Sequence, residues 1–125
     1  MQHSLQFDNK RTQASQDKSF QYHYNRLNPA QKLAVDNIEG AVMVIAGPGT
    51  GKTQILAVRI AKILADTDAQ AHNILCLTYT DAAVIAMRRR LVEIIGPAAH
   101  QIHIYTFHGF CNQVIQEHLL SLIHI

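Results

Sequence analysis

The sequence lacks the features that mark a secreted or membrane protein. It has no apolar stretch long enough to span a bilayer, and its polar N-terminus lacks the apolar core of a signal peptide. Its two cysteines, Cys76 and Cys111, both lie in apolar segments. We therefore expect two buried, free thiols in a reducing compartment, with the cytoplasm as the location.

Charge and metal-binding patterns are also sparse. The net charge is +2 at pH 7 with neutral histidines, so bulk charge gives no indication of nucleic-acid binding. The eight histidines are scattered, and no pair of them has zinc-site spacing with a pair of cysteines. The chain does have a 48% hydrophobic content over 125 residues, which suffices for one modest globular domain with its own core.

Apolar runs alternate with amphipathic helical patterns along most of the chain. Residues 1–25 are polar without a sustained period, and they predict a flexible leader. A short helix after an Asn28 cap is then expected, followed by three strand–helix units with strands at 41–45, 74–77 and 102–107. This alternation predicts an α/β fold for residues 26–119, with a parallel sheet covered by helices on both faces.

The spacing of apolar residues within the expected helices predicts which side chains face the core. The inward candidates are Leu33, Ile38, Leu56, Ile60, Ile63, Leu64, Val84, Met87, Leu91 and Ile94, with Val114, Ile115, His118 and Leu119 on or beside one face of the last helix. Either Thr80 or Asp81 caps the helix expected after the second strand, and Gly96-Pro97 ends that helix. Its run Arg88–Arg90 is interpreted as a solvated face on which Arg89 pairs with Glu93.

A glycine-rich segment directly follows the apolar run at 41–45 and precedes a helical pattern. Glycines let the backbone close round a phosphate, and the start of a helix points its positive end at the same group. Lys52 is suited to reach the β- and γ-phosphates of ATP, and the Thr53 hydroxyl is suited to hold Mg²⁺. A chance glycine-rich turn is the alternative, which the strand before and the helix after disfavour. We thus predict an ATP-binding loop made of Ala46, Gly47, Pro48, Gly49, Thr50, Gly51, Lys52 and Thr53.

Two further strand ends carry hydroxyl and aromatic side chains, in Thr78-Tyr79-Thr80 and in Thr106-Phe107-His108. Parallel strands end at the same edge of a sheet, so both tripeptides and the glycine-rich loop are expected along one rim. Hydroxyls suit nucleic-acid phosphates, and aromatic rings suit the stacked bases of a single strand. The alternative is that Tyr79 and Phe107 are core residues, and composition alone favours this slightly.

Together these motifs resemble the N-terminal end of the UvrD/Rep family of superfamily 1 DNA helicases over about residues 27–118. Four stretches match in order: 27–31 (LNPAQ) the Q motif, Ala46–Thr53 motif I, 78–90 motif Ia, and 106–109 (TFHG) motif Ib. The resemblance implies a P-loop NTPase lobe of RecA type, incomplete in these 125 residues. It also implies ATP-driven 3′-to-5′ movement on single-stranded DNA, with unwinding at a junction with duplex.

The resemblance assigns roles to individual residues. It implies that Gln31 selects adenine, that Lys52 and Thr53 act as catalytic residues on the phosphates and Mg²⁺, and that Tyr79, Thr80, Thr106 and His108 touch DNA. The chain departs from the family pattern at Gln54, where many members have Arg, and at Asp81, Ala82 and Ala86 in motif Ia. These departures weaken the expectation for the DNA contacts more than for ATP binding.

No apolar run ends in Asp-Glu, so the catalytic acid of such an enzyme is absent from these residues. By resemblance this acid, the arginine fingers and the second lobe are expected downstream, and the polypeptide alone is expected neither to hydrolyse ATP usefully nor to unwind DNA. Residues 120–125 (LSLIHI) are either a helix tail or the translation of a transposon-based sequencing-library adapter. Two other functions stay open: a small P-loop kinase or regulator, and a non-enzymatic nucleotide-binding module.

Overall fold

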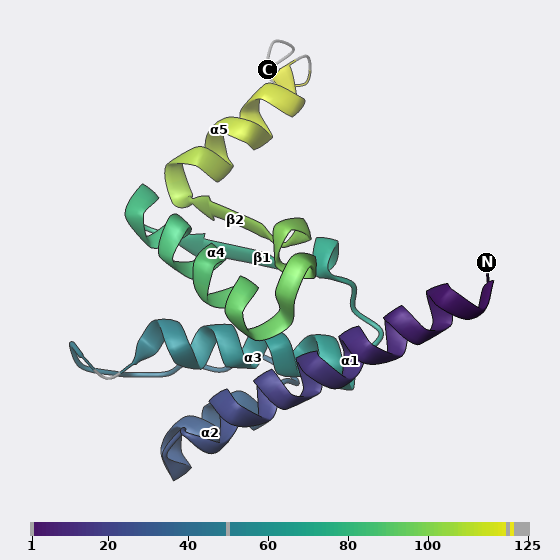
Figure 1. Ribbon diagram of the computed structural model, residues 1–125. Helices are drawn as coiled ribbons and strands as arrows, with labels where there is room; N and C mark the ends of the chain where they lie inside the picture. The colour runs from purple at the N-terminus through teal and green to yellow at the C-terminus, as the bar shows by residue number, and fades with distance from the viewer. Residues whose placement is uncertain (1, 50, 120, 122–125) are drawn as a thin grey trace.

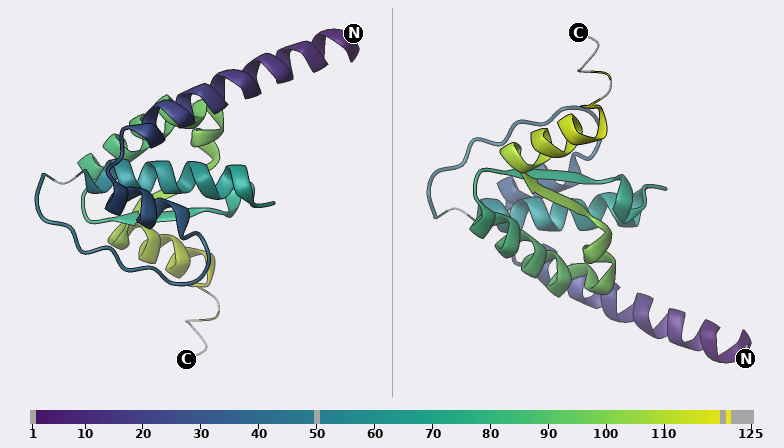
Figure 2. Two further views of the ribbon diagram at one scale, coloured as in Figure 1. Left: turned by 90° about the horizontal axis from the view of Figure 1, so that it is seen from below. Right: turned by 90° about the horizontal axis from the view of Figure 1, so that it is seen from above.

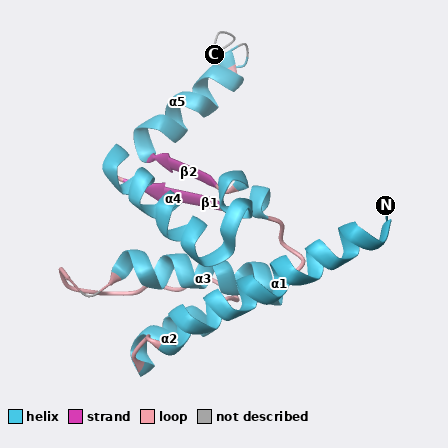
Figure 3. Cartoon of the chain, viewed as in Figure 1, coloured by secondary structure: helices cyan, strands magenta, loops and turns pink. Residues whose placement is uncertain are grey.

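The computed structural model describes residues 2–49, 51–119 and 121, and the side chains of these from residue 13 onward. It is an α/β structure with five α-helices, two short 3₁₀ helices and two strands (Figures 1 and 3). In chain order they are α1 (Gln2–Asn25), α2 (Pro29–Asp36), α3 (Lys52–Asp66), η1 (Ala71–Asn73), β1 (Leu75–Thr78), α4 (Asp81–Ile95), η2 (Gly96–Gln101), β2 (His103–Thr106) and α5 (Phe107–Glu117). Apart from Ser121, the expected tail at 120–125 lies outside the described residues.

The two strands pair in parallel, as the sequence predicted. Leu75 lies opposite His103, and the register continues to Thr78 opposite Thr106. Cys76 and Ile104 are buried in the main core, while Tyr105 on the other face contacts the Phe110 ring of α5, with 6.2 Å between ring centroids. Since α4 also packs on both strands, the pair has a helix on each face.

The strand expected at 41–45 is absent, and this prediction was wrong. Residues 41–47 have no regular structure, and Figure 2 shows the segment between α2 and α3 as a long open loop. Met43 is 85% exposed and Ile45 is 91% exposed. A strand needs a neighbouring strand to satisfy its backbone groups, and β1 and β2 pair only with each other. The apolar run therefore remains outside the described sheet.

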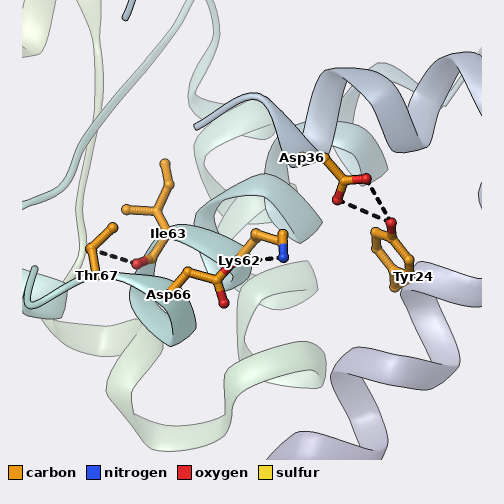
Figure 4. Close-up of polar contacts among 6 residues, drawn as sticks. All are labelled: Tyr24, Asp36, Lys62, Ile63, Asp66 and Thr67. Carbon is orange, nitrogen blue, oxygen red and sulfur yellow. Dashed lines mark hydrogen bonds and ion pairs between the residues drawn. The ribbon is translucent and has the colours of Figure 1, made fainter. Parts of the chain in front are cut away.

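The N-terminal segment, for which a flexible leader was expected over residues 1–25, forms helix α1 from Gln2 to Asn25 in this structure. Ser19 Oγ donates a hydrogen bond to the Glu93 carbonyl of α4 at 2.9 Å, and Phe20 packs against the core. Tyr24 OH donates to both carboxylate oxygens of Asp36 in α2, at 3.0 and 2.8 Å (Figure 4). The segment contains no glycine or proline, and these contacts stabilise a helix that its weak apolar pattern does not indicate.

The core lies where α3 and α4 meet each other, α2 and the strands. Its largest fully buried side chains are Leu91, Ile94, Ile102, Val35 and Val58. Inward positions were predicted correctly for α4, where Val84 packs on the core and Met87, Leu91 and Ile94 are buried.

The inward face was predicted less well for the other helices. In α2 the buried residue is Val35 and Leu33 is exposed, while in α3 Leu56 is exposed and Ile60 is buried. Partners pack on α3 from several sides, so its buried face is broader than one stripe and includes Ile55, Ala57, Val58 and Ala61. No residue of α5 is buried, and Val114, Ile115 and Leu119 are exposed.

Three smaller expectations also changed. Cys76 is buried as predicted, and burial raises the pKa of its thiol, but Cys111 is exposed because α5 packs loosely. Arg88 is partly buried with hydrogen bonds of its own, and the ion pair on this face joins Arg90, not Arg89, to Glu93 at 3.6 Å. Gly96 ends α4 with a φ of 74°, as expected for a helix-terminating glycine.

Candidate functional site

The start of α2 holds Gln31 in a fixed position. The Gln31 backbone N–H donates to Asn28 Oδ1 at 2.9 Å, and the Asn28 backbone N–H donates to Gln31 Oε1 at 2.9 Å. This reciprocal capping box satisfies two of the free N–H groups at the helix start. It also places the Gln31 amide nitrogen beside Gly51. A Cβ atom added to Gly51 would lie 3.6 Å from Gln31 Nε2. The predicted Q-motif glutamine and the end of the glycine-rich loop are therefore neighbours.

The glycine-rich loop turns through two left-handed residues before α3 begins. Gly49 has a φ of 73° and Gly51, which precedes the first residue of α3, has a φ of 74°. Residues with a side chain rarely adopt this conformation, so glycine is required at both positions. Thr50 lies outside the described residues. The local sequence thus produces the sharp entry into α3 that the motif predicted.

A hollow of about 640 Å³ joins the loop to α2. Four predicted loop residues line it, together with Gln31 and the apolar side chains of the open segment. The loop residues are Ala46, Gly47, Gly49 and Gly51. Pro48, Lys52 and Thr53 are exposed and do not line this hollow. The start of α2 forms the wall of the hollow that faces the glycine-rich loop.

These residues fit a nucleotide phosphate with Mg²⁺ in chemical terms. The two left-handed glycines leave the backbone without side chains at the start of a 15-residue helix, where its dipole favours an anion. Lys52 and Thr53 occupy the first turn and are exposed, so the ammonium group and the hydroxyl are accessible. A hydroxyl oxygen is a ligand type that Mg²⁺ accepts.

The ends of β1 and β2 carry an exposed aromatic pair. The rings of Tyr79 and Phe107 lie 5.1 Å apart between centroids, tilted by 42°. Tyr79 is 87% exposed and Phe107 is 42% exposed. The interpretation of these rings as core residues was therefore wrong, because the helices cover the faces of the strand pair and leave its end open. In Figure 1 the start of α3 and the carboxyl ends of both strands lie on the same side of the molecule.

The threonine hydroxyls beside this pair cap the following helices. Thr80 Oγ1 accepts a hydrogen bond from the Ala83 backbone N–H at 3.1 Å, so Thr80 rather than Asp81 is the N-cap of α4. Thr106 Oγ1 accepts one from the Gly109 N–H at 3.0 Å at the start of α5. A hydroxyl that accepts one bond can still donate its own hydrogen. His108 is exposed in the first turn of α5, so all the predicted DNA contacts lie at this end of the strands.

Sequence reasoning missed a third part of the site, which comes from α1. Tyr22, His23 and Arg26 line a second hollow that also includes Gln31 and Gly51. In the sequence, the sign of this pair was the four-residue spacing of Tyr22 and Arg26. Such spacing brings two side chains together only if the segment is helical, and the sequence did not indicate a helix there.

Two features of other functional classes are absent from the described residues. None of the helices there combines the length and apolar character needed to cross a membrane. Nor do three or more His, Cys, Asp or Glu side chains gather in that part of the chain in a way that could hold a metal ion.

Comparison with known proteins finds DNA helicases among the relatives of this chain. A family model described as the UvrD/REP helicase N-terminal domain matches residues 27–123. The ATP-dependent DNA helicase PcrA of Bacillus subtilis is 40% identical over 91 residues, which is 73% of this chain and 12% of that protein. A probable DNA helicase of Mycoplasma pneumoniae is 41% identical over 93 residues, which is 74% of this chain and 18% of that protein.

A third relative, PcrA of Staphylococcus aureus, is 36% identical over 93 residues, covering 74% of this chain and 13% of that protein. The chain thus spans between 12% and 18% of the length of these curated relatives. Residues 1–26, with all of α1, precede the range that the family model matches.

Proposed function

Because this chain belongs to the family of the UvrD/REP helicase N-terminal domain, we propose that it is the ATP-binding segment of an ATP-dependent DNA helicase. The proposed substrate is single-stranded DNA or its junction with duplex, with movement from 3′ to 5′. The fold that goes with this function is a P-loop NTPase lobe of RecA type.

The observation that carries the proposal is the contact between the capping box of α2 and the end of the glycine-rich loop. Gln31 and Gly51 are far apart in sequence, yet they line one hollow beside the start of α3. A side-chain amide next to a phosphate-binding loop suits a nucleotide, whose base has hydrogen-bonding edges and whose phosphates are anionic.

Within this proposal, different residues of the chain bind different parts of the nucleotide. Gln31 reads the adenine edge, the backbone from Ala46 to Gly51 surrounds the phosphates, and Lys52 neutralises their charge. Thr53 holds Mg²⁺, which neutralises charge on the phosphates when bound. The catalytic Asp-Glu pair, the arginine fingers and the second lobe are proposed to belong to other parts of the parent protein.

The rim of the strand pair is the proposed DNA contact. Two exposed rings 5.1 Å apart form an aromatic surface on which unpaired bases stack. Thr80, Thr106 and His108 lie beside them and supply polar hydrogens for backbone phosphates. Asp81 begins α4, two residues after Tyr79. Its carboxylate would repel an approaching DNA phosphate, whereas the hydroxyl groups beside it would not.

Binding assays with two ligands test the proposal. Wild-type protein is expected to bind Mg·ATP, measured by calorimetry, and a fluorescent poly-dT oligonucleotide, measured by anisotropy. Lys52→Ala should weaken ATP binding about tenfold to a hundredfold, the range for loss of a hydrogen-bonded charge. Lys18→Ala, which removes an exposed charge on α1, is the matched control and should leave ATP binding unchanged.

The DNA arm of the same test separates the alternatives. Tyr79→Ala should weaken oligonucleotide binding about fivefold to a hundredfold while ATP binding is retained. Binding of ATP without any oligonucleotide binding would instead favour a small P-loop kinase or a nucleotide-binding regulatory module. Failure of the wild type to bind ATP would refute the proposal.

A further inference from the structure

The second hollow has a volume of about 450 Å³ and adjoins the nucleotide loop. It shares Gln31 and Gly51 with the first hollow, so the two cavities meet at the point where α2 touches the start of α3. Its size falls within the range of ligand pockets, about 300–1,000 Å³. The wall that faces away from the glycine-rich loop is formed by the last turns of α1, through Tyr22, His23 and Arg26.

Tyr22 and Arg26 form a preassembled pair in this wall. Arg26 Nη1 donates a hydrogen bond to Tyr22 OH at 2.6 Å, and the guanidinium carbon lies 5.2 Å from the Tyr22 ring centroid. Tyr22 remains 57% exposed, so it is not a core residue. An aromatic ring beside a planar guanidinium group is a surface that nucleobases stack on.

The remaining walls combine polar side chains with the apolar Leu27, and none of the lining residues is acidic. Gln54 Nε2 lies 3.0 Å from His23 Nδ1, while Gln54 Oε1 is buried without a hydrogen-bond partner. Arg90 of α4 closes the far side. Arg26 and Arg90 are the charged lining residues. Arg90 pairs with Glu93 at 3.6 Å, but no carboxylate lines the hollow, so it suits an anionic or neutral ligand better than a cation.

A ligand that fills both hollows must combine two kinds of chemistry. At the α3 end it needs phosphates, because the left-handed Gly49 and Gly51 line the first hollow there and the helix dipole of α3 begins at the next residue, the exposed Lys52. At the α1 end it needs a flat ring with hydrogen-bonding edges. A nucleoside triphosphate has both, and Gln31 stands between the two regions.

We propose that α1 supplies the base platform of the nucleotide site, with the Tyr22–Arg26 pair stacking on the purine ring whose edge Gln31 faces. This inference rests on the proposed ATP-binding function. It assigns a specificity-determining role to residues that precede the range matched by the family model.

Comparing ATP with inorganic tripolyphosphate tests the platform separately from the phosphate loop. Each is titrated with Mg²⁺ into the wild type and into Tyr22→Ala, Tyr22→Phe, Arg26→Ala and Lys18→Ala. Tyr22→Ala should weaken ATP binding about fivefold to a hundredfold and leave tripolyphosphate binding unchanged. Tyr22→Phe keeps the ring and should retain most of the affinity for ATP, and Lys18→Ala should match the wild type for both ligands.

The outcomes separate this inference from the function on which it rests. If the wild type binds ATP and Tyr22→Ala binds it equally well, the platform is refuted and the ATP-binding proposal stands. If Tyr22→Ala does not fold, the wild type alone decides, because equal affinities for ATP and tripolyphosphate would exclude a base platform. If the wild type binds neither ligand, both proposals fail.

Discussion

At the residue scale, Arg88 connects α4 to the segment that leads into β2. Its Nη1 donates hydrogen bonds to the carbonyl oxygens of Ala99 and Ile102, both at 2.7 Å. Both carbonyls belong to buried residues, where an unpaired acceptor costs more than it does in water. The first residue of an arginine run thus fixes the path of the chain into the sheet.

We expect Arg88→Met to lower the free energy of unfolding by about 1–3 kcal/mol, because it removes a charged donor from two buried carbonyl groups, of which only that of Ala99 keeps a second donor, the Ile102 N–H, among the hydrogen bonds described. Urea denaturation followed by circular dichroism measures the change. Arg89→Met is the matched control, since Arg89 is exposed, and it should stay within about 0.5 kcal/mol of the wild type. Equal losses in the two variants would contradict a structural role specific to Arg88.

At the element scale, α1 is held to the body by a few polar contacts and two aromatic side chains. His23 Nδ1 accepts from Gln54 of α3, Tyr24 donates to Asp36 of α2, and Ser19 donates to α4. Burial lowers the pKa of His23, and the Arg90 charge lowers it further, against an opposing effect of Glu93. The neutral imidazole is therefore the form that supports docking of this helix.

The direction of this pKa shift predicts how pH affects stability. Between the lowered pKa in the folded state and about 6.5 in the unfolded state, the unfolded chain binds more protons. The contribution of His23 to stability is thus present above about pH 6.5 and is lost as pH falls through the folded-state pKa.

We therefore expect the melting temperature of the wild type to fall more between pH 7.5 and 5.5 than that of His23→Asn. Asparagine retains an acceptor for Gln54 but does not titrate, and the other histidines contribute equally to both proteins. Differential scanning fluorimetry provides the measurement. Parallel pH profiles for the two proteins would show that His23 is not the group responsible.

Helix α1 and the run at 41–45 show why some elements could not be predicted. Every residue of α1 is compatible with a helix, but the segment has no sustained apolar period, and the docking of Phe20 and Tyr24 is visible only in three dimensions. The run at 41–45 has the composition of a buried strand, yet a strand exists only beside another strand, and composition does not say whether a partner is available.

At the scale of the whole molecule, the proposed nucleotide site lacks the Asp-Glu pair that a hydrolytic site of this kind needs. The glycine-rich loop and Gln31 line one hollow, but no Asp-Glu pair occurs anywhere in the sequence. The proposed ATP binding can therefore be tested separately from hydrolysis.

We expect the 125-residue chain to bind Mg·ATP without appreciable turnover, and addition of single-stranded DNA should not raise the rate. Phosphate release measured with a coupled assay provides the test, and Lys52→Ala defines the background. A DNA-stimulated rate well above that background would show that this chain contains a catalytic acid that its sequence does not reveal.

The sequence by itself determined the local chemistry: the capping of α2 by Asn28, the glycine-rich turn before α3, the apolar runs that become β1 and β2, and the inward face of α4. These depend on residues close together in the chain, so spacing and side-chain type suffice to predict them. Only the tertiary structure decided that Tyr79 and Phe107 are exposed at the rim, that the run at 41–45 is unpaired, and that α1 lies beside Gln31. Each of these depends on which distant segment packs against which, and a linear pattern does not encode that choice.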